Sequence, residues 1–226
     1  SRDYGKVVLN VIKKNIPDVV AFSVNSSNVN YVKKIARLLK QKYPAILIVF
    51  GGIYPTLLPE IIMQCPEVDA ICIGEGERSF LDYLNKLDQN NEPLIPGIWY
   101  RKGNKEIVKN RLRQFESNID NIPFPDRKIF DISKYVKTSF FSSLPFEASR
   151  GCLYNCSFCS SPVIRNNFPG RYFRMHSPMY IIEEIEAAAV DFWNKGFRCV
   201  DFADDNFGLD MNWFYNFCSL YKLSLI

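Results

Sequence analysis

Three short apolar runs in the first 90 residues constrain the fold of this chain more than any other feature. They cover residues 19–24, 46–50 and 70–73, and each is followed by polar or glycine-rich residues and then by a helical pattern. Uninterrupted apolar runs of this length are typical of strands that are buried on both faces. Because strands that alternate with helices form parallel sheets, the sequence predicts an α/β fold with a partial doubly wound sheet, of which three parallel strands are visible.

The alternating pattern stops near residue 90, and we divide the chain into three parts. Residues 1–90 form the α/β domain, residues 91–143 a hairpin and linker, and residues 144–226 the start of a second domain with two strand–helix units. The expected strands of that domain are residues 144–148 and 200–203. We expect the loops after both strands to share one face, where the active sites of parallel barrels lie.

A loop with three cysteines follows the first strand of the second domain. Its cysteines are spaced C-x-x-x-C-x-x-C, with Phe158 before the third, and they are Cys152, Cys156 and Cys159. Three thiolates on one loop can bind three irons of a four-iron cluster and leave the fourth iron open to a small molecule. Structural zinc, held by these cysteines and the single histidine His176, is one alternative, and unrelated cysteines are another.

Polar and glycine residues follow the other expected strands. Asp204 and Asp205 come after residues 200–203, where they can accept hydrogen bonds from an amine or from ribose, or cap the next helix. Four glycines follow the second and third runs of the first domain: Gly51, Gly52, Gly74 and Gly76. They either let a cofactor or a domain approach the backbone or simply form tight turns. The sequence has no G-x-G-x-x-G, which argues against a dinucleotide site.

Composition narrows the class of protein. The net charge of +4 comes from interspersed charges and gives no reason to expect a nucleic-acid partner. No apolar run approaches the roughly 20 residues of a membrane span, and no secretory leader opens the chain. Seven cysteines with three in one cluster fit metal chemistry in a reducing compartment, so we expect a cytoplasmic protein. The other four are expected in the core: Cys65, Cys72, Cys199 and Cys218.

These residues resemble the radical S-adenosylmethionine (SAM) enzymes, specifically the class with an N-terminal cobalamin (B12)-binding domain. The cysteine loop, flanked by S-R-G before and S-S-P after, matches the cluster motif of that class. Residues 202–207, which read F-A-D-D-N-F, and the glycine loops at residues 51–56 and 74–77 are also similar. The resemblance implies a flavodoxin-like, cobalamin-binding sheet followed by the start of a (β/α)6 partial barrel. It also implies that this sequence is a fragment lacking both ends, with little activity of its own.

By this resemblance, the three cysteines hold a [4Fe-4S] cluster, and SAM chelates the open iron. Phe158 lies near the adenine, and Asp204 or Asp205 lies near the methionine or ribose end. The tentative cobalamin residues are Ser26, Gly51, Gly52, Gly74 and Gly76. Reductive cleavage of SAM gives a 5′-deoxyadenosyl radical for methyl transfer to, or cyclisation of, an organic substrate. An electron donor such as flavodoxin or ferredoxin is implied, the substrate is an unidentified small molecule or peptide, and no residue is assigned a catalytic role.

Two other hypotheses stay open. The N-terminal domain of a radical SAM enzyme can lose cobalamin and only pack against the barrel, and no histidine in residues 1–175 is present to ligate cobalt. The other hypothesis is a zinc-stabilised binding module with no enzymatic activity.

Overall fold

The computed structural model describes residues 4–87, 94–103 and 106–224. It divides into two compact units, Ser1–Phe115 and Glu116–Ile226. The boundary that we place near residue 90 lies outside the described residues. The stretch that we assign to a hairpin and linker is divided between the two units.

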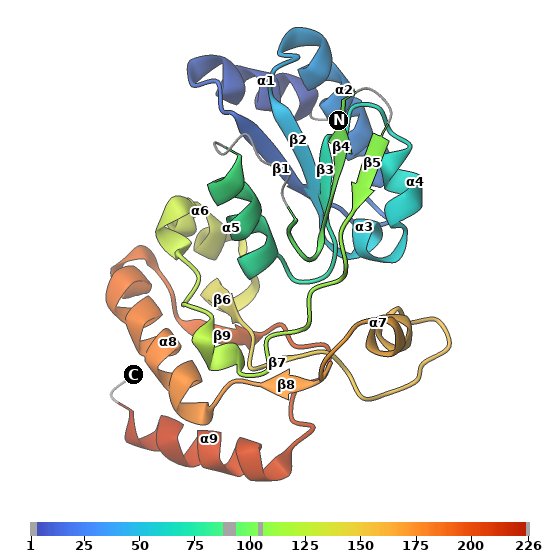
Figure 1. The fold of residues 1–226 in the computed structure, drawn as a ribbon. Helices are drawn as coiled ribbons and strands as arrows, with labels where there is room; N and C mark the ends of the chain where they lie inside the picture. The colour runs from blue at the N-terminus through green and yellow to red at the C-terminus, as the bar shows by residue number, and fades with distance from the viewer. Residues whose placement is uncertain (1–3, 88–93, 104–105, 225–226) are drawn as a thin grey trace. The chain divides into compact units, whose positions relative to one another are not determined.

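The first unit is built on a five-stranded sheet whose spatial order follows the chain (Figure 1). Its strands are β1 (Val19–Ser23), β2 (Leu47–Gly51), β3 (Ala70–Cys72), β4 (Ile98–Lys102) and β5 (Glu106–Lys109). The first three are parallel, as the apolar runs predict, and β4 and β5 are antiparallel additions. The predicted hairpin is therefore present, and its two strands, β4 and β5, extend the sheet beyond β3. Residues 104 and 105, between these strands, lie outside the described residues.

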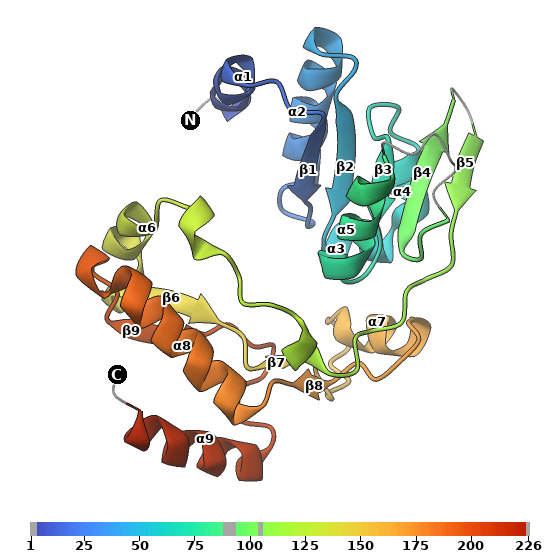
Figure 2. The same ribbon diagram turned by 60° about the vertical axis from the view of Figure 1, so that its left-hand side comes forward.

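Helices cover the two faces of this sheet unequally. They are α1 (Tyr4–Lys14), α2 (Val29–Lys42), α3 (Ile53–Leu57), α4 (Pro59–Met63) and α5 (Gly76–Lys86). Figures 1 and 2 show α5 on one face of the sheet and α3 and α4 on the other. Ala21 and Ser23 of β1 are exposed, so the prediction that the first run is covered on both faces is wrong within the described residues. The reason is that β1 is an edge strand and α5 packs at β3 and β4.

The second unit contains two strand–helix units. Strands β6 (Ser143–Phe146) and β9 (Cys199–Phe202) pair in parallel, and they precede α8 (Pro178–Phe192) and α9 (Met211–Leu223). Ser177 caps the start of α8, because its hydroxyl accepts a hydrogen bond from the Tyr180 amide, and Pro178 occupies the first turn. Gly196, in a left-handed conformation (φ 103°), ends the turn after α8.

Several short elements of this unit lie outside the predicted pattern. They are α6 (Ile132–Thr138), α7 (Ser161–Asn167), the antiparallel strands β7 (Ser149–Arg150) and β8 (Arg174–Met175), and four 3-10 turns, η1 (Ile119–Asn121), η2 (Arg127–Ile129), η3 (Phe140–Ser142) and η4 (Trp193–Lys195). In all the described residues, no helix is long and apolar enough to cross a membrane.

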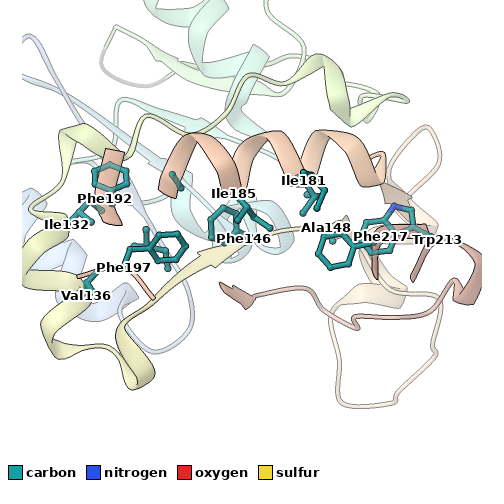
Figure 3. Packing of buried hydrophobic residues seen from close by; sticks show 13 residues of the cluster. Ile132, Val136, Phe146, Ala148, Ile181, Ile185, Phe192, Phe197, Trp213 and Phe217 are labelled. Atoms are coloured by element: carbon teal, nitrogen blue, oxygen red, sulfur yellow. The ribbon is translucent and has the colours of Figure 1, made fainter. Parts of the chain in front are cut away.

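The core of the second unit holds β6 in place. Phe146 and Ala148 pack with Ile181 and Ile185 of α8, and all four are buried (Figure 3). Burying a side chain such as Phe146 contributes roughly 2–3 kcal/mol. This packing fixes β6, which leads through β7 into the cysteine loop.

Candidate functional site

The cysteine loop begins at a glycine that no other residue can easily replace. Gly151 has φ +83°, and a Cβ there would lie 2.6 Å from the Tyr172 carbonyl oxygen. Beyond it, Cys152 is half-buried, Cys156 and Cys159 are exposed, and all three are free thiols. The loop thus leaves β7 along a path set by close contact with Tyr172.

An arginine from the following helix contacts the loop between its first two cysteines. The Arg165 Nη1 atom donates hydrogen bonds to the Cys152 carbonyl (3.2 Å) and the Leu153 carbonyl (2.7 Å). Its Nη2 atom donates to the Asn155 side-chain oxygen. The motif alone does not reveal this residue, because Arg165 lies outside the cysteine spacing.

The third cysteine lies beside hydrogen-bond donors at the start of α7. Hydrogen bonds from Ser161 lower the pKa of the Cys159 thiol, and the Ser161 amide lies 3.5 Å from the Cys159 sulfur. The Tyr172 hydroxyl lies 3.4 Å from the Ser161 hydroxyl. Burial raises the pKa of Tyr172, and the charges of Asp205, Cys159 and Cys152 raise it further. Tyr172 is therefore within electrostatic reach of two cysteines and the acidic loop.

The three cysteines fit a cluster by the chemistry of their donor set. The described residues contain no group of three or more His, Cys, Asp or Glu arranged around a single metal ion. Thiolates of a [4Fe-4S] cluster each bind a different iron, so they need not converge on one point. His176 is engaged elsewhere: it is buried, its Nδ1 lies 3.0 Å from Asp120 Oδ1, and its ring stacks on Tyr180. Three free thiols without His176 favour a cluster over the zinc alternative.

The two adjacent aspartates have different surroundings. Asp204 Oδ2 accepts a hydrogen bond from the Ala148 amide (3.0 Å), and Oδ1 accepts one from the Ser149 hydroxyl (2.5 Å). Asp204 therefore joins the end of β9 to the end of β6. The negative charge of Asp205 raises the pKa of Tyr172 and, against the hydrogen bonds from Ser161, also acts to raise the pKa of Cys159. Protein groups therefore engage both carboxylate oxygens of Asp204, whereas Asp205 is exposed.

The first unit has a groove of about 400 Å³ at the carboxyl ends of its parallel strands. The four predicted glycines line it together with Ser23, Cys72 and residues of α5. Ser26 is not among the lining residues and lies in the exposed turn before α2, whereas Ser23, which we did not predict, stands at the end of β1. Burial raises the pKa of Cys72 to about 11, so this thiol stays neutral, as expected of a core cysteine.

The glycines of this groove serve two purposes. Gly52 (φ +92°) and Gly74 (φ +84°) are turn residues, and a Cβ on Gly52 would lie 3.0 Å from the Val24 backbone. At Gly51 and Gly76 a Cβ would meet Cys72 at ordinary contact distances of 3.7 and 3.8 Å. Gly51 and Gly76 have no side chains that would extend into the groove, so a bulky cofactor could approach the backbone closely at the end of the sheet.

A threonine ties the two glycine loops together. The Thr56 hydroxyl donates to the Gly52 carbonyl (2.8 Å) and accepts from the Gly74 amide (3.0 Å). Thr56 is only 9% exposed, so water could not easily replace its hydroxyl as the hydrogen-bond partner of either glycine loop.

The comparisons with known proteins show what the chain is similar to. Residues 5–84, which include all the residues that line the groove, match the B12 binding domain family. Over 209 residues the chain is 32% identical to an uncharacterised methyltransferase of Pyrococcus horikoshii, covering 90% of the chain and 43% of that protein. It is also 32% identical over 151 residues to the cobalamin-dependent radical SAM methyltransferase TokK of Streptomyces tokunonensis, covering 63% of the chain and 22% of TokK.

A solved structure shares the fold. The cobalamin-dependent SAM radical enzyme OxsB, with aqua-cobalamin and SAM bound, superimposes with a TM-score of 0.78 at 20% identity, covering 98% of the chain and 31% of OxsB. The predicted fold class is confirmed. The chain is a relative of the radical SAM enzymes that carry a cobalamin-binding domain, and it spans less than half the length of each of these relatives.

Proposed function

We propose that this chain is part of a cobalamin-dependent radical SAM enzyme that transfers a methyl group to, or cyclises, an organic substrate. The observation that carries the proposal is the exposed loop of three free thiols after β7, with Asp205 within electrostatic reach. The match of residues 5–84 to the B12 binding domain supports cobalamin as the second cofactor. Both reactions stay in the proposal, because the relatives of this chain include proteins named as methyltransferases and others named as anaerobic magnesium-protoporphyrin IX monomethyl ester cyclases.

The proposal assigns roles to the three cysteines and to a few residues near them. Cys152, Cys156 and Cys159 hold the cluster as thiolates, and the Ser161 amide stabilises the sulfur of Cys159. When bound, the reduced cluster supplies one electron that cleaves SAM to methionine and a 5′-deoxyadenosyl radical. Phe158, 92% exposed, offers a ring face to the adenine. Asp205 accepts hydrogen bonds from the amine or ribose of SAM.

The groove of the first unit is the proposed cobalamin site. Gly51 and Gly76 leave room for the corrin, and the Ser23 hydroxyl offers a hydrogen-bond partner at the end of β1. The proposal also requires an electron donor such as flavodoxin or ferredoxin. Free thiols in an exposed loop support a reducing compartment, and we place the enzyme in the cytoplasm.

Anaerobic reconstitution of the full-length protein with iron and sulfide tests the cluster. We expect a brown protein with about four irons and about four sulfides per chain in this loop. The variant Cys156→Ala should lose them, whereas Cys65→Ala, which removes a free cysteine of the first unit, should keep them. A colourless protein that holds zinc, or iron binding unchanged in Cys156→Ala, contradicts the proposal.

A separate titration tests the second cofactor. Cobalamin added to the full-length protein should be retained through gel filtration with a changed absorption spectrum. Iron binding without retention of cobalamin would favour the hypothesis that the first domain no longer binds it.

A further inference from the structure

We infer that Arg165 is a positioning residue for the cluster, which holds the loop between the first two cysteines in shape and places a positive charge beside it. This inference rests on the proposed function. It concerns the conformation of the cysteine loop before the cluster binds, and not the cleavage of SAM.

The contacts of Arg165 span most of the gap between Cys152 and Cys156. The guanidinium reaches the carbonyls of Cys152 and Leu153 and the side-chain oxygen of Asn155. A guanidinium presents five donors in a rigid planar fork, so it can bind three acceptors at once without losing its own geometry. The first cysteine is thus constrained at its own carbonyl, and the second is constrained one residue before it.

Other forces on this stretch are weak. Residues 152–156 belong to no helix or strand, and Leu153 and Tyr154 are each 55% exposed. Neither a backbone ladder nor apolar burial therefore defines the path of the chain here. Side-chain hydrogen bonds are what remains, and Arg165 supplies three of them from α7.

The position of Arg165 on α7 makes it a firm support. The neighbouring Ile164 and the first helical residue Ser161 are both buried, so α7 is packed against the unit while its guanidinium reaches out to the loop. The same helix presents the Ser161 amide to Cys159. One short helix therefore contacts the loop at both ends, through a charged fork near the first cysteine and a backbone amide at the third.

A lysine at position 165 could not make the three contacts of Arg165. A lysine keeps the charge but presents it as a compact ammonium, which cannot span three acceptors. Comparing lysine with methionine therefore separates geometry from charge. The potential of an iron–sulfur cluster depends on net charge and nearby hydrogen bonds, so loss of the positive charge should lower it.

The test uses the full-length protein with Arg165→Lys, Arg165→Met and, as a charge-matched control, Arg171→Met at an exposed position of the same segment. Before reconstitution, hydrogen exchange at the Cys159 amide, which donates to the Cys156 carbonyl (3.1 Å) directly after the stretch that Arg165 holds, should rise about tenfold or more in both Arg165 variants, because a charge-assisted hydrogen bond commonly contributes a factor of this size. Exchange in β6 and α8 should stay unchanged. After reconstitution, iron content should fall several-fold in both variants, and the cluster's midpoint potential should drop further in Arg165→Met than in Arg165→Lys.

Loop exchange, iron content and potential equal to those of the wild type would overturn the inference. An equal rise of exchange in β6 and α8 would also overturn it, because Arg165 would then only support general packing. If the wild-type protein takes up no iron while exchange still rises only in the loop of the variants, the proposed function fails instead. The two failures are therefore distinguishable.

Discussion

Replacing Thr56 with valine should loosen both glycine loops of the groove. Valine has nearly the same volume but no hydroxyl, so the hydrogen bonds with the Gly52 carbonyl (2.8 Å) and the Gly74 amide (3.0 Å) are both lost. Each contributes about 1 kcal/mol, and an amide left without a partner at a 9% exposed site costs about as much again. The expected loss is about 2–3 kcal/mol of local stability.

Hydrogen exchange is the suitable assay, because a multidomain protein does not unfold in two states. Exchange through local opening should accelerate roughly 30- to 150-fold at residues 52–56 and 73–77, and retention of cobalamin should weaken with it. The control is Thr138→Val at the exposed end of α6, which removes hydrogen bonds to the Lys134 and Tyr135 carbonyls and should cost less than about 0.5 kcal/mol. Exchange within about threefold of the wild type in Thr56→Val would refute the reasoning.

Two further changes test the second unit. Gly151→Ala adds a clash at 2.6 Å with the Tyr172 carbonyl to the backbone cost of positive φ, so it should reduce local stability at β7 and β8 by at least about 2 kcal/mol, measured by hydrogen exchange. Gly208→Ala (φ +82°, no atom within 4 Å of its Cβ) should cost only about 1 kcal/mol; equal losses would contradict the packing argument. Burial lowers the pKa of His176, opposed by Asp120, so its stabilising effect is present above the unfolded value near 6.5 and is lost as pH falls through the folded pKa. The melting temperature should therefore drop more between pH 7 and 5.5 in the wild type than in His176→Phe, and equal drops would exclude this origin.

The sequence predicts where the helices and strands of this chain lie better than it predicts which of them pack against one another. Strands have an apolar pattern that is visible locally, which is why β2, β3 and β9 lie close to their expected bounds. The pairing of β4 with β3 depends on register between distant segments, and no local pattern specifies it. The exposure of β1 likewise depends on which strands and helices flank it.

The same limit applies to the site. Ser26 lies in a polar cluster that is visible in the sequence, but Asn25 organises that turn by accepting hydrogen bonds from Ser27 and Asn28. Ser23 reaches the groove instead because it ends a strand. No sequence motif includes Arg165, because its contacts arise only when α7 packs beside the cysteine loop. The local sequence predicts the three cluster cysteines, whereas no local pattern points to Arg165, whose contacts with their loop appear only in the fold.

Both units join successive strand ends with one polar side chain. In the first unit Thr56 links the loops after β2 and β3, and in the second Asp204 links the ends of β9 and β6. A side chain whose hydrogen-bonding atoms are already satisfied by protein gains little from a ligand, because binding would first break those bonds. Cofactor contacts should therefore fall to the residues beside these links, which are Asp205 next to Asp204 and the open glycines Gly51 and Gly76. The polar residue whose partners the protein supplies maintains the geometry of each loop, and we expect a cofactor to contact the residues beside it.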